Sequence, residues 1–388
     1  MNLLFGFRFL SDYMWNIKAF TIAFIPLTLI LCAELHRQFY INNKGCIPSL
    51  SKVDFFLWGY ICLISLSFFS YGGVGSVEIY VKILTVLIAF YLGKVTPLFN
   101  IKKIYLFYIP IYLIIILYLI SGNGFQYWGS IVTFSGGYFY KTDLAIGLTL
   151  FTVFMLVSNL NVKLKLSFVF LNLVLIFLAN SRMYLLLLPI ITALYFYRRI
   201  IFLNTKRFFV MLPIIFSLIF LVFYSFNDIL LNFGFLAVDF NDFFSGKNLQ
   251  GRDLLWDNLL SSYSDFSLFN QLFGSGLVKD TELAFLTGYF ESTNAHNTYI
   301  FNLISVGVFG SLFFFAFIIT SFKRLLSLFE KYRDYPKLYD LLYLSVACTF
   351  LFFIAGFSAT VISFLQLSWF YFFFMGVLYS VNFQKFNK

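Results

Sequence analysis

Long apolar runs alternate with short polar segments along the whole chain. Each run is about as long as a helix needs to cross a bilayer, which takes roughly 20 residues. A membrane β-barrel would show shorter segments that alternate between apolar and polar positions. We therefore expect an all-α polytopic membrane protein with 11 transmembrane helices, or 10 to 12 if the boundaries shift. The expected spans cover residues 17–35, 53–70, 76–93, 104–121, 143–160, 166–180, 183–200, 208–226, 297–320, 341–360 and 363–382.

The composition supports a membrane protein. Hydrophobic residues make up 61% of the chain and charged residues 11%, against about 25% charged residues in soluble proteins. The net charge of +10 does not indicate nucleic-acid binding, because the basic residues fall in short loops between apolar runs. The four cysteines are scattered without a CxxC motif, so we expect neither a disulfide framework nor a metal site.

Clusters of Lys and Arg predict the orientation in the membrane. Loops rich in these residues face the cytoplasm, and here they alternate with loops that contain few of them. The other connections are then extracytoplasmic, and they comprise residues 122–142, the turn near Arg182 and residues 227–296. The residues that define the cytoplasmic side are Lys94, Lys102, Lys103, Lys163, Lys165, Arg198, Arg199, Lys206, Arg207, Lys323, Arg324, Lys331, Arg333, Lys337, Lys385 and Lys388.

The orientation of the N-terminus stays open. Arg37, Lys44 and Lys52 also indicate a cytoplasmic loop, which would place the first residues outside despite Arg8 and Lys18. Either the first residues form an extra short or interfacial element, or the number of spans differs by one.

The loop at residues 227–296 separates an N-terminal bundle, residues 1–226, from C-terminal helices, residues 297–388, within one integrated membrane domain. A loop this long inside a compact fold is usually functional or disordered. Its sequence GRDLLWDNLLSS predicts a helix with Leu255 and Leu259 on one stripe, and a later Gly-Ser-Gly sequence ends the segment that follows. We expect a partly helical cap on the outer membrane surface.

Three residues on this expected outer face are candidates for chemistry. Arg182 lies in a turn between two apolar runs, where it either serves a functional site or extends its charge to the headgroups. Arg252 opens the predicted cap helix and either binds an anion or pairs with Asp253 or Asp257. His296 precedes a span, where the helix dipole favours a neutral imidazole; it is either a general base or a capping residue.

Together the three residues supply two fixed cations and one titratable base. The loop has no DxD motif and the chain has no Cys/His cluster, so the sequence does not indicate a metal ion. Two guanidinium groups can instead neutralise a diphosphate leaving group and fix it by bidentate hydrogen bonds.

The motifs GRDLLWD, LFGSGL and AHNTYIFNLISVGVFG, in this order, resemble the signature of the O-antigen polymerase and ligase superfamily. The resemblance covers roughly residues 251–310, and upstream the pair Ser181-Arg182 is similar to the family's Ser-Arg at a periplasmic helix start. Elsewhere it rests on topology. One departure is the stretch YFYKTDLA, which stands where many members have an Asn-rich start of a span.

This resemblance implies a glycosyltransferase of the GT-C-like membrane fold that inverts the anomeric centre and needs neither a metal ion nor a cofactor. It implies that His296 is the base or positions the acceptor. Arg182 and Arg252 would also act directly in catalysis, by binding the diphosphate of an undecaprenyl-linked glycan. The expected substrate-binding residues are Arg182, Arg252, Lys141, Asn297 and Trp256, of which Lys141 lies in the stretch YFYKTDLA that departs from the family pattern.

The expected function is that of a Wzy-type polysaccharide polymerase in the bacterial inner membrane, with its active site on the periplasmic side. Its donor and acceptor would be undecaprenyl-diphosphate-linked oligosaccharides, and a chain-length regulator and a flippase of the same pathway would be partners. The first alternative is an O-antigen ligase that transfers the glycan to lipid A core. The second is a flippase or small-solute transporter, which the few ionisable residues inside the spans argue against.

Overall fold

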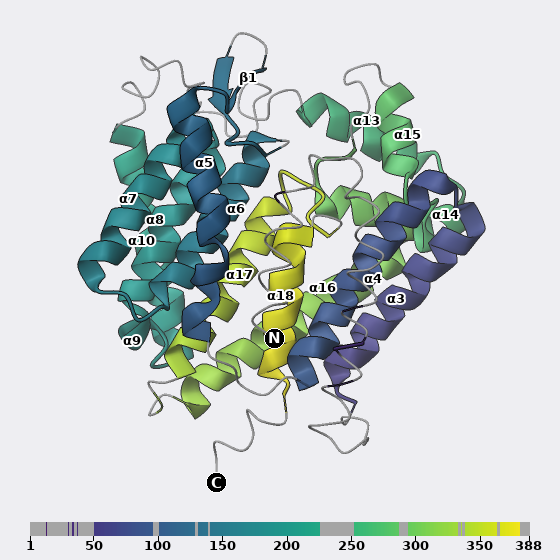
Figure 1. The fold of residues 1–388 in the computed structure, drawn as a ribbon. Coiled ribbons are helices and arrows are strands. Elements are labelled where there is room, and N and C mark those ends of the chain that lie inside the picture. The colour runs from purple at the N-terminus through teal and green to yellow at the C-terminus, as the bar shows by residue number, and fades with distance from the viewer. Residues whose placement is uncertain are drawn as a thin grey trace. The chain divides into compact units, whose positions relative to one another are not determined.

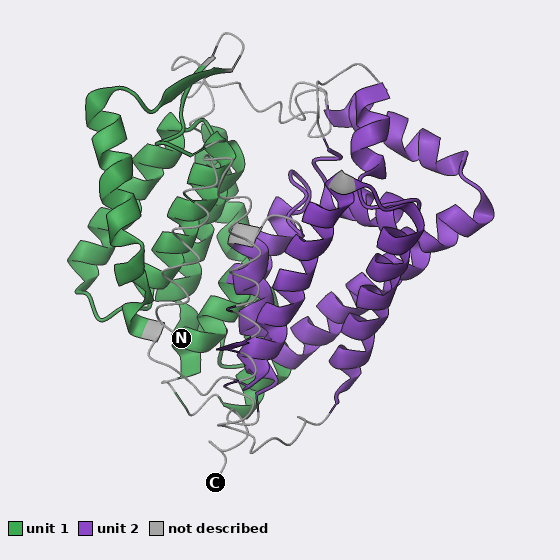
Figure 2. Ribbon diagram, turned by 45° about the vertical axis from the view of Figure 1, so that its right-hand side comes forward, with its two compact units in different colours: residues 1–23, 98–237, 326–347 green, residues 24–97, 238–325, 348–388 purple. Residues whose placement is uncertain are grey.

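The computed structural model describes two compact units, each built from separate stretches of the chain (Figure 2). Unit 1 comprises residues 1–23, 98–237 and 326–347, and unit 2 comprises residues 24–97, 238–325 and 348–388. The expected three-part division of the chain around the membrane stays a prediction. The described residues are 50–95, 101–128, 131–138, 140–225, 252–286, 294–332, 335, 338–362 and 365–380, together with Tyr13, Ile30, Ala33, Glu34 and Arg37.

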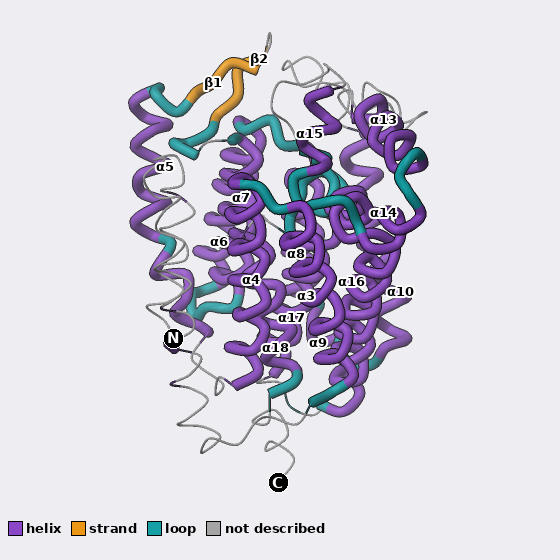
Figure 3. Tube along the Cα trace, turned by 90° about the vertical axis from the view of Figure 1, so that its right-hand side faces the viewer, coloured by secondary structure: helices purple, strands orange, loops and turns teal. Residues whose placement is uncertain are grey.

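Helices make up most of the described chain (Figure 3). Every expected span from residues 53–70 onward overlaps a described helix, which supports the helical membrane-protein class. The first expected span, residues 17–35, lies almost entirely outside the described residues, and the number of crossings stays a prediction. Among the described residues, four helices are long and apolar enough to cross a membrane, namely Lys52–Tyr71, Gly75–Val95, Thr205–Ser225 and Thr298–Lys331.

Unit 1 is a helical bundle in which α6, α7 and α8 pack against one another (Figure 1). A buried hydrogen bond of 2.7 Å, from Asn172 Nδ2 to Thr152 Oγ1, joins α7 to α6. The expected span 104–121 is divided in two, because Pro110 has no N–H to continue a helix and suits the first turn of a new one. The elements of unit 1 are the 3₁₀ helix η3 (Ile101–Phe107), α5 (Ile109–Ser121), β1 (Phe125–Trp128), β2 (Ile131–Phe134), α6 (Lys141–Leu156), α7 (Val162–Leu178), α8 (Arg182–Phe196), α9 (Arg198–Ile201), α10 (Thr205–Ser225), the end of α16 (Thr298–Lys331, from residue 326) and the start of α17 (Tyr339–Ala355, to residue 347).

Residues 122–142, which were expected only as an extracytoplasmic connection, contain a short hairpin formed by β1 and β2. The strands pair antiparallel with Phe125 opposite Phe134, and the centroids of these two rings lie 5.1 Å apart. The Phe134 side chain is buried, so the hairpin covers part of the core of unit 1. Strands of four residues show too few alternations of apolar and polar positions to be recognised beside long helical runs.

Unit 2 is built around the close pairing of α4 with α18. A Cβ atom added at Gly93 would lie 2.1 Å from the Phe373 carbonyl oxygen, and one added at Gly376 would lie 1.9 Å from the Phe90 carbonyl oxygen. Small residues therefore allow the two backbones to touch, as in many membrane helix pairs. The helices of unit 2 are α3 (Lys52–Tyr71), α4 (Val74–Val95), α13 (Arg252–Ser264), α14 (Leu268–Phe273), α15 (Lys279–Leu286), α16 (Thr298–Lys331, to residue 325), α17 (Tyr339–Ala355, from residue 348) and α18 (Leu365–Leu378).

A buried ion pair joins α3 to α4 in unit 2. Lys94 Nζ lies 2.7 Å from Asp54 Oδ2, and the two side chains are 5% and 1% exposed. The same carboxylate oxygen accepts hydrogen bonds from the Ser51 backbone N–H and hydroxyl group, which caps the start of α3. The charge of Lys94, expected only to mark a cytoplasmic loop, is therefore also part of the packing of unit 2.

α16 differs from the expected span 297–320 in two respects. It extends to Lys331, so Lys323 and Arg324, which were expected in a loop, are helical. Lys and Arg are good helix formers, and positive charge suits the end of a helix. The helix is also broken at Gly307, which has φ 68 and ψ −170.

The expected cap is helical and consists of α13, α14 and α15, which we call the cap (Figure 1). The predicted helix GRDLLWDNLLSS is α13, in which Leu255 and Leu259 are buried as expected. Gly274 ends α14, again as expected. Tyr71, the last residue of α3, holds the cap through a hydrogen bond of 2.7 Å from its hydroxyl group to Asn270 Oδ1.

The cap also enters the break in α16. The backbone N–H and the hydroxyl group of Ser275 both donate to the Ile304 carbonyl oxygen, at 2.9 and 3.0 Å. A Cβ atom added at Gly307 would lie 2.5 Å from the Leu272 carbonyl carbon. Glycine is therefore required at this position for two reasons, namely the positive φ and the close approach of the cap backbone.

Candidate active site

The expected site residues are divided between the two units. Arg252, Trp256, His296 and Asn297 lie in unit 2, and Arg182 lies in unit 1. Lys141, the remaining expected substrate-binding residue, also lies in unit 1. We describe the cluster of each unit by itself.

In unit 2, His296 lies in a short segment that leads into α16, with its backbone in the left-handed region at φ 46. Few residues other than glycine adopt this conformation, although Asn, Asp and His do so more often than most. The side chain that caps α16 is that of Asn297, whose Oδ1 accepts the backbone N–H groups of Tyr299 and Ile300 at 2.9 and 3.1 Å. The imidazole of His296 is therefore not needed to cap the helix.

The cap fixes the residue directly before His296. Asp280 Oδ2 accepts the backbone N–H of Ala295 at 2.8 Å, and Trp256 Nε1 donates to the carbonyl oxygen of Ala295 at 2.9 Å. The backbone N–H of His296 donates to Asn294 Oδ1 at 2.8 Å. Side chains of the cap helices α13 and α15 thus bind the carbonyl oxygen and the N–H of Ala295, and this defines the position of the next residue, His296.

The connection between α17 and α18 fixes the residues that follow His296. The backbone N–H of Thr298 donates to the Gly356 carbonyl oxygen at 2.8 Å, and its hydroxyl group donates to the Ala359 carbonyl oxygen at 2.9 Å. The same hydroxyl oxygen accepts the backbone N–H of Val361 at 2.7 Å. The strained conformation of His296 is therefore held from both sides.

The electrostatic environment keeps His296 neutral. Burial, and to a smaller extent the positive charge of Arg252, lowers the pKa of His296 to about 4. Arg252 is the first residue of α13, and Trp256 lies four residues later on the same face of that helix. The structure thus brings Arg252, Trp256 and His296 together, whereas their roles toward a substrate stay predictions.

Asp280 is a residue that the sequence analysis did not identify. Burial raises the pKa of its carboxyl group to about 6, and backbone N–H donors, including that of Ala295, lower it part of the way back. Asp280 and Ala284, four residues apart, are both buried, which places the carboxylate in the buried stripe of α15. An acidic residue within such a stripe is the sequence signal that would have identified it.

In unit 1, the position of Arg182 follows from the way α7 ends. The backbone N–H of Asn180 donates to the Phe177 carbonyl oxygen at 2.8 Å, and that of Ser181 donates to the Ile176 carbonyl oxygen at 3.4 Å. With Asn180 at φ 51, these two bonds form a Schellman motif, the common end of a helix. The chain therefore reverses within three residues, and Arg182 is the first residue of α8.

Lys141 occupies the equivalent place on α6, as the first residue of that helix. Because α7 runs back between them in sequence, α6 and α8 point the same way, and their N-terminal ends lie at the same end of unit 1 (Figure 1). A helix N-terminus carries a partial positive charge. Placing Lys141 and Arg182 there concentrates positive charge and suits an anion.

The described part of the chain contains no group of three His, Cys, Asp or Glu side chains that could hold a metal ion. The metal-free chemistry implied by the resemblance stays a prediction.

The comparison with known families covers the stretch of chain that contains the motifs described above. A family model described as O-antigen ligase matches residues 167–315, a stretch that includes Arg182, Arg252 and His296. No curated protein matches the chain. The family match confirms that the resemblance of this chain is to the O-antigen polymerase and ligase superfamily.

Proposed function

We propose that the protein is a Wzy-type polysaccharide polymerase, which transfers a growing glycan from undecaprenyl diphosphate to the sugar end of a lipid-linked repeat unit. The observation that carries this proposal is that His296 is half-buried and lies close enough to Arg252 for the charge of Arg252, together with burial, to lower the pKa of the imidazole. A base beside a fixed cation is what glycosyl transfer from a diphosphate carrier requires.

In the proposed reaction, a hydroxyl group of the acceptor sugar attacks the anomeric carbon of the donor glycan. The new glycosidic C–O bond forms while the bond from the anomeric carbon to the diphosphate oxygen breaks, with inversion. The His296 imidazole accepts the hydroxyl proton, and the lipid diphosphate leaves with the electron pair. Arg252 neutralises the charge that develops on the diphosphate, and no metal ion is required.

A pKa of about 4 keeps His296 free of a proton at neutral pH but makes it a weak base. A bound diphosphate would offset the charge of Arg252 and bring negative charge of its own, and both effects raise the pKa of the imidazole. In this proposal the donor therefore strengthens the base that it requires, and the base stays weak while the site is empty.

For Arg182 we retain the role that the family resemblance implies, which is binding of the lipid diphosphate. Lys141 lies in the stretch that departs from the family pattern, and for it we retain only the expected role in substrate binding. The support within unit 1 is that each residue is the first of its helix, at the same end of the unit. The side-chain hydrogen bonds of Trp256 and Asn297 indicate that these residues position the segment around His296. A contact with substrate would then use the face of the Trp256 indole ring or the amide N–H₂ group of Asn297.

The second candidate function is transfer of the finished glycan to lipid A core, because the matching family model is described as O-antigen ligase. Both reactions use the same donor and the same leaving group, so the residues above serve either. They differ in the acceptor. In either case we place the enzyme in the bacterial inner membrane with its active site on the periplasmic side, since the basic loops predict that the cap is extracytoplasmic.

The test is glycan transfer by purified protein supplied with the lipid-linked repeat alone, or with the lipid-linked glycan together with lipid A core as acceptor. His296→Asn is the most informative variant, because Asn tolerates the left-handed backbone at φ 46 but cannot accept the proton. We expect turnover to fall by about 10²–10⁴. His36→Asn, a change of the second of the two histidines, is the control and should leave turnover intact.

Near wild-type turnover in His296→Asn would reject the base role. A ladder of products with the lipid-linked repeat identifies the polymerase, and a single transfer to lipid A core identifies the ligase. Absence of both products with wild-type protein would reject both functions.

A further inference from the structure

A cavity of about 310 Å³ opens at the end of unit 1 where the sequence predicts the cytoplasm. Its polar lining comes from η3, the end of α6, α8, α9 and the start of α17, and consists of Lys102, Ser158, Tyr195, Arg198, Arg199 and Asp340. None of these residues belongs to the candidate active site. A water molecule occupies about 30 Å³ in the liquid, so the cavity has room for a group several times that size.

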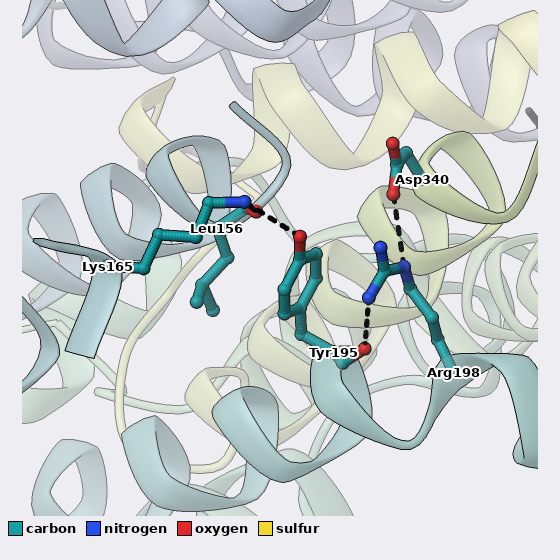
Figure 4. Close-up of polar contacts among 5 residues, drawn as sticks. All are labelled: Leu156, Lys165, Tyr195, Arg198 and Asp340. Carbon is teal, nitrogen blue, oxygen red and sulfur yellow. Dashed lines mark hydrogen bonds and ion pairs between the residues drawn. The ribbon is translucent and has the colours of Figure 1, made fainter. Parts of the chain in front are cut away.

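Arg198 is fixed in the wall of this cavity by three contacts (Figure 4). Its Nε lies 3.1 Å from Asp340 Oδ1, and its Nη1 donates to the Tyr195 carbonyl oxygen at 2.7 Å. Its guanidinium carbon also lies 3.8 Å from the centroid of the Tyr195 ring. Among the described residues, its Nη2 has no hydrogen-bond acceptor, so one edge of the guanidinium is held in place and still able to donate.

A buried lysine adds charge behind the same tyrosine (Figure 4). Lys165, which is 5% exposed, donates to the Leu156 carbonyl oxygen at 2.5 Å and to the Tyr195 hydroxyl group at 2.8 Å. These partners are neutral, and within the described chain no carboxylate pairs with Lys165. A buried ammonium group that lacks a counter-ion favours an anion nearby.

The sum of the charges around the cavity determines whether it suits an anion or a cation. The cavity and its wall contain four cations, Lys102, Lys165, Arg198 and Arg199, and one carboxylate, Asp340. The C-terminal ends of α6 and α8 face the same region, and each is equivalent to about half a negative charge. The remaining charge is about +2, or about +1 if Lys102 is left out, so the cavity suits an anion.

We propose that this cavity binds a phosphate group through Arg198, Arg199 and Lys102. Both arginines line the cavity, and a guanidinium group matches the geometry of phosphate oxygens and can bind them in a bidentate manner. The phosphate belongs either to the headgroup of an anionic lipid in the adjacent leaflet or to a soluble phosphate compound, and the chemistry of recognition is the same for both.

The test uses the full-length protein purified in detergent. Its melting temperature is followed during titration with short-chain phosphatidylglycerol, phosphatidylcholine of the same chain length and inorganic phosphate, all at constant ionic strength. A ligand that binds the folded protein raises the melting temperature in a dose-dependent way. We expect phosphatidylglycerol or inorganic phosphate to do so and phosphatidylcholine to have no effect.

The variant Lys102→Gln/Arg199→Gln removes two exposed cations of the cavity and leaves the contacts of Arg198 intact. We expect the dissociation constant of the effective probe to rise at least about tenfold. The matched control is Lys163→Gln/Arg207→Gln, which removes the same charge from exposed positions outside the cavity and should bind as the wild type does. Arg199→Gln alone is the milder variant if the double variant melts early.

A response to inorganic phosphate identifies a soluble ligand, and a response to phosphatidylglycerol alone identifies a lipid headgroup. Two results would overturn the proposal. One is that neither of the two anionic probes, phosphatidylglycerol and inorganic phosphate, raises the melting temperature of the wild type above the effect of the zwitterionic phosphatidylcholine. The other is that the control variant loses as much affinity as the cavity variant.

Discussion

The lowered pKa of His296 gives the sharpest test of the site, because it follows from two causes that can be changed separately. Burial is the larger cause and the positive charge of Arg252 is the smaller one. In Arg252→Gln the charge is lost but the burial remains. The pKa of His296 should therefore rise in this variant and still lie below the ordinary value of 6.5.

The size of the effect is large enough to measure directly. With a pKa of about 4, roughly one His296 imidazole in a thousand carries a proton at pH 7, whereas about a quarter would do so with an ordinary pKa. Since the folded protein takes up this proton less readily than the unfolded chain, folding stability falls as the pH drops from about 6.5 to about 4.

The assay is a titration of the imidazole by nuclear magnetic resonance in detergent micelles. The chain has 2 histidines, so His36→Gln leaves one labelled ring, and its carbon shift reports the protonation of His296 alone. We expect a midpoint near pH 4 in the protein without substrate, and a higher midpoint after addition of undecaprenyl diphosphate. In Arg252→Gln the response to undecaprenyl diphosphate should be smaller, because the proposed diphosphate contact is lost.

Lys279→Gln provides the control, since it removes a cation of the cap that already pairs with Glu282 at 3.0 Å. This variant should leave the midpoint unchanged. A wild-type midpoint near 6.5, or equal shifts in Arg252→Gln and Lys279→Gln, would falsify the assignment of the lowered pKa to burial and to the charge of Arg252. A midpoint that does not respond to undecaprenyl diphosphate would refute the idea that the donor strengthens the base.

Two further predictions follow from buried polar contacts. Asp280→Ala should lower turnover by about 10- to 100-fold with little change in the KM for the lipid-linked repeat, because it releases Ala295 and misplaces His296. If the variant lost activity only because its melting temperature had fallen as well, the role of Asp280 would be structural. Lys94→Met should destabilise the protein by about 3–5 kcal/mol, because Asp54 stays buried without its partner, and Asp54→Leu/Lys94→Met should recover much of the melting temperature. A single variant as stable as the wild type would contradict this view of the ion pair.

The sequence predicted those features that depend on short stretches of chain. The apolar runs located the helices, and the stripe of Leu255 and Leu259 predicted α13 with its buried face. The order of the short motifs indicated the family that the comparison with known proteins then supported. Gly307 was recognised only as part of a motif, although its positive φ and its contact with the cap require glycine for physical reasons.

The remaining features depend on contacts between distant residues, which local patterns do not reveal. Asp280 binds a residue 15 positions away, and Trp256 binds the same residue across 39 positions. Trp256 was expected to bind substrate because of its place in a motif, whereas its indole N–H is used to hold the chain before His296. The left-handed backbone of His296 is likewise a consequence of these contacts and not of its own sequence.

The break in α16 shows how His296, although it lies on a connecting segment, is held in place as the proposed catalytic role requires. The hydrogen bonds of Thr298 hold the start of the segment from Thr298 to Ile304, and the hydrogen bonds of Ser275 to Ile304 hold its end. Ser275 belongs to the cap, which also contains Arg252. A shift of the cap would therefore displace the histidine and the arginine together, so their separation is kept. An unbroken α16 would offer no free carbonyl oxygen at Ile304, and the cap would then be tied to this helix only through the residues before His296.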